Sequence, residues 1–141
     1  MPEYATSNRT LNPFTAGGYF RLSSVVLALV GLLGIILAAI GQSHLLDFGM
    51  SPGFLTLTFT HSIVHLVLAA VAALLGFGSM APGVVKTMAI VIGAVYAALG
   101  ILGFFVTNPL GGGLALALGL GGNLVHLLLG ALGLVAGFRG D

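Results

Sequence analysis

Charged residues are so sparse in this chain that they leave three long uncharged stretches. These stretches run from Arg21 to Asp47, from Asp47 to Lys86 and from Lys86 to Arg139, and the third holds 52 residues between its ends. Only 5% of the chain is charged, whereas soluble domains contain about 25% charged residues. So few charges cannot make a chain that is 58% hydrophobic soluble in water. Lipid is therefore its expected solvent.

Each uncharged stretch is long enough to cross the hydrocarbon core of a bilayer, which is about 30 Å thick. The third is about twice as long as one span requires, and turn-forming residues at 107–109 and 111–113 divide it. Lipid offers the backbone no hydrogen-bond partners, so runs of this length are expected to be α-helices. The predicted spans are 22–42, 54–77, 84–106 and 115–138. They follow a polar cytoplasmic segment, residues 1–21, and make residues 22–141 one all-α membrane domain.

All four basic residues fall on one side of the membrane in this topology. Arg9 and Arg21 precede the first span, Lys86 opens the third, and Arg139 follows the fourth. The loops 43–53 and 107–114 contain no basic residue. The positive-inside rule assigns the basic side to the cytoplasm. We therefore expect a multi-pass protein of the cell membrane with both termini in the cytoplasm.

One segment of the chain occurs twice. Residues 62–77 read SIVHLVLAAVAALLGF and residues 123–138 read NLVHLLLGALGLVAGF, with 7 of 16 positions identical at an offset of 61. The first and third spans match more weakly at an offset of 62, where Gly31 aligns with Gly93. The pattern predicts a four-helix bundle built from two tandem helical hairpins. Because two spans return the chain to its starting side, the repeats are expected to be parallel, with their axis along the membrane normal.

Each copy of the repeat carries a histidine at the head of a stripe of small residues. Such stripes mark the faces where membrane helices pack together, so both histidines are expected to point into the bundle. The stripes lie at steps of three or four residues and comprise Ser62, His65, Ala69, Ala72 and Gly76 in the first copy, and Asn123, His126, Gly130, Gly133 and Gly137 in the second.

A histidine at membrane depth is costly unless it is paired, and it is a candidate functional residue for that reason. A neutral imidazole has one donor and one acceptor, which nearby polar side chains could satisfy. We therefore predict a polar cluster that either binds a ligand or locks the helices together. Its predicted members are His65, His126, Asn123, Ser62 and Tyr96, with Thr60 as a further partner for the histidines.

Three ligands are alternatives to this structural role. His65 and His126 could bind the iron of haem b from two sides. A divalent metal could use His61 and His65, which are four residues apart, together with His126, although no carboxylate or thiolate accompanies them. A quinone, a pigment or a lipid head group could occupy a polar pocket. His61 aligns with Gly122 in the second copy, and we interpret it as an interfacial residue. The prediction therefore includes no metal site.

Several classes of activity lack their usual groups in this chain. It contains no cysteine, and none of its Asp or Glu residues lies within a span, which removes thiol nucleophiles and intramembrane carboxylate relays. The runs Gly111–Gly113 and Gly119–Gly122 do not follow a strand and lack the lysine of a phosphate-binding loop. Four basic residues are too few for a nucleic-acid surface. We predict no catalytic residues.

The final span resembles a prokaryotic family of small membrane proteins classed as a domain of unknown function. The resemblance rests on residues 123–134, NLVHLLLGALGL, which match the pattern Asn-x-x-His-x-x-x-Gly-x-x-Gly-Leu of that family's last helix. It implies four spans and cytoplasmic termini and brings no activity. The first copy departs from the pattern at Ser62, Ala69 and Ala72. In span number the chain is also similar to quinone-linked four-helix proteins of the DoxX type.

The sequence favours a non-enzymatic accessory or structural subunit of the membrane. Its partners would be lipid and other transmembrane helices, in a homo-oligomer or a larger membrane complex. The alternative function is the binding of a membrane cofactor or lipophile through inward-facing His65 and His126. A small transporter or channel is the third.

Overall fold

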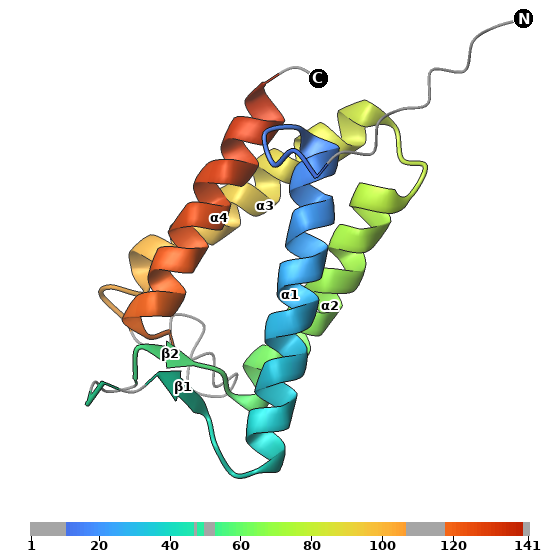
Figure 1. Cartoon of the computed structure of the whole chain (residues 1–141). Helices are drawn as coiled ribbons and strands as arrows, with labels where there is room; N and C mark the ends of the chain where they lie inside the picture. Colours follow the sequence, from blue (N-terminus) through green and yellow to red (C-terminus); the bar gives the residue numbers. More distant parts are fainter. Residues whose placement is uncertain (1–10, 47, 50–52, 107–117, 140–141) are drawn as a thin grey trace, which may run out of the picture.

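Four helices dominate the computed structural model, which describes residues 11–46, 48–49, 53–106 and 118–139. They are α1 (Ala16–Ala39), α2 (Phe59–Phe77), α3 (Pro82–Leu102) and α4 (Leu120–Phe138). All four are long and apolar enough to cross a membrane. Two short strands, β1 (His44–Leu46) and β2 (Leu55–Thr56), pair antiparallel between α1 and α2 (Figure 1).

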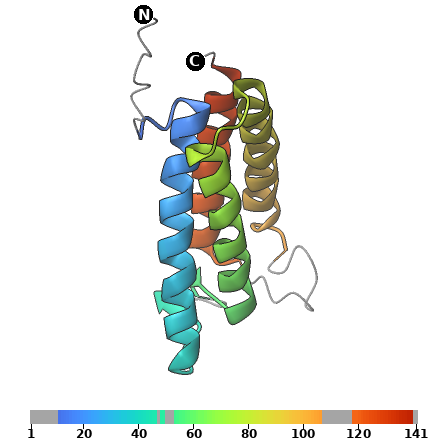
Figure 2. The same ribbon diagram turned by 90° about the vertical axis from the view of Figure 1, so that its right-hand side faces the viewer.

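The helices form two pairs that converge at one end of the bundle. α1 packs along α2 and α3 along α4, while contacts between the two pairs are far fewer. The pairs approach each other where α1 begins and α4 ends, and they separate toward the end that carries β1 and β2 (Figure 1). Seen from the side, the four helices run roughly along one direction (Figure 2). At that end the backbone N–H of Gly121 donates to the carbonyl of Phe54 at 2.8 Å, which fixes the start of α4 to the segment before β2.

Polar caps, rather than hydropathy, set where the first two helices begin. α1 begins at Ala16, six residues before the predicted span, because the Thr15 hydroxyl accepts a hydrogen bond from the N–H of Gly18 at 3.1 Å. α2 begins at Phe59, where the Thr58 hydroxyl accepts from the N–H of His61 at 3.2 Å. The prediction of a helix from residue 54 is therefore wrong at its start, because residues 55–56 pair with β1.

The remaining boundaries differ by a few residues. α3 begins at Pro82, whose fixed φ suits the first turn of a helix, and it ends at Leu102 rather than at residue 106. α4 begins at Leu120 after Gly119. The first residues of the predicted fourth span, 115–117, lie outside the described residues.

Small residues bring the helices close together. A Cβ added at Gly93 of α3 would lie 2.7 Å from the backbone nitrogen of Leu134 in α4, and one added at Gly76 of α2 would lie 2.7 Å from the backbone nitrogen of Arg21 in α1. The small residues predicted to pack are all buried, namely Ala69, Ala72, Gly76, Gly130, Gly133 and Gly137.

The apolar core lies at the end where the two pairs converge. Its largest members are Tyr19 and Phe20 of α1, which are each 1% exposed, and it extends to Ala72 of α2 and Ala136 of α4. Large apolar side chains such as Leu29, Leu74 and Leu128 point outward along the helices. Such an outer surface is suited to lipid.

Candidate ligand site

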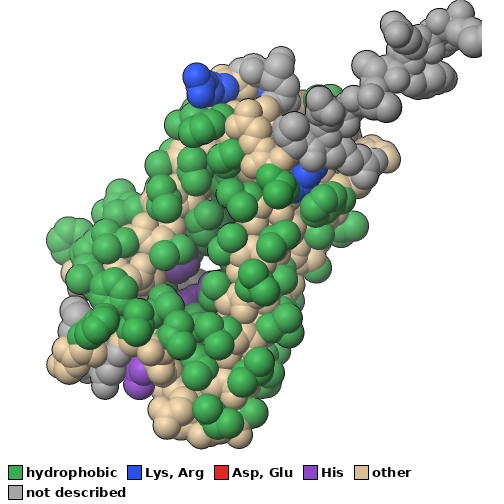
Figure 3. Space-filling model, in the orientation of Figure 1, with side chains coloured by type: hydrophobic (Ala, Val, Ile, Leu, Met, Phe, Trp, Pro, Cys, Tyr) green, Lys and Arg blue, Asp and Glu red, His purple; other side chains and the backbone are tan. Residues whose placement is uncertain are grey.

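A cavity of about 170 Å³ lies between the two helix pairs, on the side of β1 and β2. Four helices and β2 contribute to its wall, which is apolar except for three histidines, Tyr96 and Thr56. Figure 3 shows histidine side chains inside an opening in this surface, surrounded by hydrophobic side chains. The apolar residues of the wall include Val26, Leu27 and Val30 of α1, Leu55 and Leu57 beside α2, and Val125 and Leu129 of α4.

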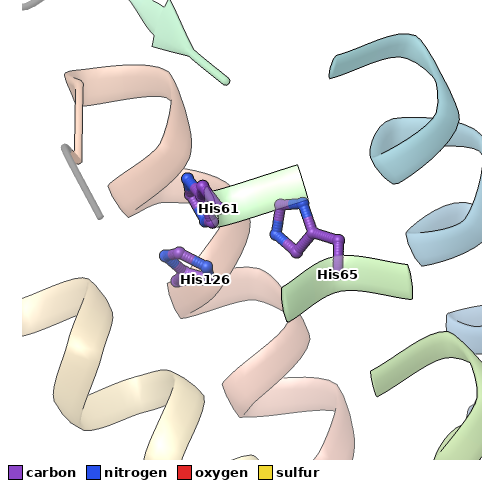
Figure 4. A group of neighbouring side chains, drawn as sticks. All are labelled: His61, His65 and His126. Carbon is purple, nitrogen blue, oxygen red and sulfur yellow. The ribbon is translucent and has the colours of Figure 1, made fainter. Parts of the chain in front are cut away.

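The three histidines of the cavity are His61, His65 and His126, and their rings face a common space (Figure 4). His61 and His65 lie one turn apart on α2, with ring centroids 4.3 Å apart, and His126 of α4 lies 6.2 Å from His61. One ring nitrogen from each lies within 4.8 Å of the others. The side chains are only 6–8% exposed. Helices α2 and α4, which belong to different pairs, thus both contribute imidazole rings to the cavity.

Each of these histidines has a buried nitrogen that makes no hydrogen bond. The Nδ1 atoms of His61, His65 and His126 have no partner within the described structure. The ring of His61 also forms a hydrogen bond with the backbone of Thr56. A buried polar group left without a partner costs about 1–3 kcal/mol. These three histidines therefore have nitrogen atoms that are available to bind a ligand.

Tyr96 adds a hydroxyl to the same cavity. Its ring stacks on that of His126, with centroids 5.5 Å apart and planes 17° from parallel. The hydroxyl is buried and has no hydrogen-bond partner among the described residues. Tyr96 lies on α3, so it completes a polar surface supplied by three different helices.

Two residues expected in the same cluster lie elsewhere. The hydroxyl of Ser62 donates to the carbonyl of Thr58 at 2.8 Å, and this side chain packs against Gly34 of α1. The side chain of Asn123 packs against Gly103 at the end of α3, and its Oδ1 is unpaired. Neither residue lines the cavity, and no hydrogen bond of the described structure joins either to a histidine. The polar cluster predicted from the stripes is therefore divided.

His61 is a cavity residue that lies outside the predicted polar cluster. Its counterpart in the second copy is a glycine, and the sequence predicts an interfacial residue there; in the structure its side chain is 6% exposed and lines the cavity. The signal that identifies it is its spacing of four residues from His65, which places both side chains on one face of a helix. The remaining histidine, His44, lies on β1, where its Nδ1 pairs with the hydroxyl of Thr56 at 3.2 Å.

This chain matches no protein-family model, no curated protein and no solved structure. The assignment of a function therefore depends on the cavity itself. Its apolar wall suits a hydrophobic molecule, and its nitrogens and hydroxyl offer hydrogen bonds or metal ligands at one end.

Proposed function

We propose that this chain is a multi-pass membrane protein that binds a small lipophilic molecule in the cavity between its two helix pairs. The observation that carries the proposal is the coincidence of an apolar wall with unpaired nitrogens of His61, His65 and His126 and the unpaired hydroxyl of Tyr96. Ligand pockets combine an apolar lining with a few convergent polar groups in this way.

The size of the cavity favours a ring-sized head group. At about 170 Å³ it is smaller than common ligand pockets, which measure roughly 300–1,000 Å³. A quinone or a similar ring with carbonyl or hydroxyl oxygens would place those oxygens against the histidines and Tyr96. A hydrocarbon tail would leave through the opening seen in Figure 3 into the surrounding lipid. A haem macrocycle is less suited to this volume.

We place the accessory-subunit function second, because the helix-locking role of the histidines that would accompany it depends on hydrogen bonds. In that role, side chains such as Ser62 and Asn123 would satisfy His65 and His126. The described structure contains no such bonds. A partner formed by other transmembrane helices is compatible with ligand binding, since the outward side chains of all four helices are apolar.

We also propose the orientation of the protein in the cell membrane. Arg21, Lys86 and Arg139 lie at the end where α1 begins and α4 ends, and the positive-inside rule supports a cytoplasmic position for this end and for both termini. The cavity would then lie in the outer half of the membrane.

A tandem duplication supports the arrangement of the cavity around α2 and α4. Both helices contain 19 residues, and the seventh residue is His65 in one and His126 in the other. We infer two hairpin repeats related by an axis along the membrane normal, with one histidine from each facing the space between them.

The test is the lipophile content of the purified protein. Wild-type protein, Gly122→Leu and the control Leu128→Ala are purified in mild detergent, extracted with organic solvent and compared by mass spectrometry. Gly122 lines the cavity, and a Cβ added there meets no atom within 4 Å, so a leucine side chain begins in open space and is expected to occupy the cavity. Leu128 is 61% exposed on the outside of α4.

The proposal predicts one lipophile enriched in the wild type and in Leu128→Ala and lost from Gly122→Leu. Identical extracts from all three proteins would contradict it.

A further inference from the structure

The three cavity histidines have the arrangement of a metal-binding site. His61 and His65 have the spacing by which two histidines of one helix reach a single ion, and His126 approaches from α4 (Figure 4). We propose that these three residues bind one transition-metal ion and leave an open coordination position facing the cavity. This inference shares the cavity with the proposed function but does not depend on lipophile binding.

The distances between the histidines allow a common ion. Metal–nitrogen bonds of about 2.0–2.1 Å at tetrahedral angles place ligand nitrogens about 3.3 Å apart. The ring nitrogens in question lie within 4.8 Å of one another. The two most distant nitrogens must therefore approach each other by up to about 1.5 Å. Rotation of the histidine side chains can supply this movement, because a cavity lies between α2 and α4.

One of the three histidines is already oriented for the role. A metal-binding histidine commonly donates its second nitrogen to a backbone carbonyl, which fixes the tautomer and aims the free nitrogen at the ion. The ring of His61 forms a hydrogen bond with the backbone of Thr56, and its Nδ1 has no hydrogen-bond partner among the described residues. Thr56 belongs to β2, so the strand pair holds this ring in place.

The ligand set restricts the type of ion. Imidazole suits zinc, copper, iron and nickel. The chain has no cysteine, and its four described helices contain no Asp or Glu, so the proposed ligands are neutral and the ion keeps its full charge. Removing charge from water is costly, and the cost rises steeply with the charge. This favours Cu⁺, whereas Zn²⁺ would require an anion such as hydroxide at the open position.

The open position follows from an asymmetry between the two copies of the repeat. The residue aligned with His61 in the second copy is Gly122, which lines the same cavity. A Cβ there would meet no atom within 4 Å, so space is left where a fourth imidazole would otherwise stand. A site with three protein ligands and one open position can accept a further ligand, such as an oxygen of a bound lipophile.

The three histidines lie near the end of their helices that carries β1 and β2. His61 is the third residue of α2, while His65 and His126 are the seventh residues of their helices. At a rise of about 1.5 Å per residue the deepest of these lies about 10 Å from the start of its helix. An ion arriving from the side of β1 and β2 therefore does not need to cross the bilayer.

The experiment measures metal binding to the chelator-stripped protein in detergent. Cu⁺ is added without oxygen in competition with bicinchoninate, and Zn²⁺ is added in a separate titration. The proposal predicts one tightly bound ion per chain. His61→Leu, His65→Leu and His126→Leu each weaken binding by at least about 100-fold, because each removes a ligand. The control His44→Gln, which alters the histidine outside the cavity, binds as the wild type does.

Two results would overturn the proposal. One is a wild-type protein that binds neither ion, and the other is an affinity that survives in all three leucine variants. If a leucine variant does not fold, glutamine replaces histidine at the same position and the same loss is expected. Gly122→Leu separates this proposal from the proposed function, because it should lose the lipophile and keep the ion. A wild type with a lipophile and no ion would contradict the metal site alone.

Discussion

The two ends of the bundle differ in how they use the space between helices. At the end where the pairs converge, Tyr19 and Phe20 fill the centre, and Gly76 allows α2 to approach the backbone of α1. At the opposite end the pairs separate, and the centre contains a cavity with unpaired histidine nitrogens. The first end holds the helices together, and the second leaves bonding capacity for a ligand. Stability and binding should therefore respond to different substitutions.

The largest effect on stability is expected from a leucine at the end where the helix pairs converge. In Gly76→Leu the first added carbon would lie 2.7 Å from the backbone nitrogen of Arg21, so the backbones of α1 and α2 would have to move apart. Overpacking of this kind costs about 3 kcal/mol. Thermal unfolding in detergent, followed by circular dichroism, should show a much lower midpoint or no folded protein. A midpoint equal to that of the wild type would contradict close packing at this end.

A glycine-to-leucine substitution at the opposite end, where the cavity lies, should change ligand binding instead. Gly122→Leu adds its side chain to empty space, so we expect its unfolding midpoint to correspond to a change of no more than about 1 kcal/mol. Its lipophile content should fall to background. The comparison fails if Gly122→Leu and Gly76→Leu destabilise the protein equally.

A cavity histidine should matter little for the stability of the empty protein. His126→Leu removes an imidazole whose Nδ1 makes no hydrogen bond, and it gains apolar contacts while losing the stacking on Tyr96. The two changes are each about 1 kcal/mol and oppose one another. We expect an unfolding free energy within about 1 kcal/mol of the wild type. A loss of more than about 3 kcal/mol would indicate instead that the histidine locks the helices together.

Two helix caps, one at each end, should have small and equal effects on stability but different effects on binding. Thr15→Ala and Thr58→Ala each remove a hydroxyl that accepts a hydrogen bond from the first turn, and each should cost about 1 kcal/mol. Only Thr58 lies beside the cavity, where it caps the turn that carries His61. We therefore expect weaker ligand binding in Thr58→Ala alone. Equal binding in both variants would show that the cap does not position His61.

Hydropathy alone was sufficient to predict four helices able to span a membrane. In lipid, a long uncharged run can satisfy its own backbone hydrogen bonds by forming a helix. Helix starts were less predictable, since they depend on single hydroxyls such as those of Thr15 and Thr58. The β1–β2 pair was not predicted, because two strands of three and two residues carry no periodic signal of their own.

The candidate site was predictable only in part. The small-residue stripes placed His65 and His126 inside the bundle, where the structure has them. The spacing of four residues places His61 and His65 on one helix face, but the enclosure of that face by α1, β2 and α4 is a tertiary effect that the spacing does not reveal. The stripes likewise indicated nothing about a cavity. Ser62 and Asn123 share their helix faces with the histidines, but they contact Gly34 and Gly103, which the spacing along one helix does not reveal.

The most direct test of a binding site between the helix pairs is the intact mass of the protein released from detergent under native conditions. For the wild type we predict a species heavier than the chain by one bound ligand, and for Gly122→Leu a species without that small molecule. If the wild type and Gly122→Leu both show the mass of the bare chain, or both carry the same molecule, the cavity is not the site of binding.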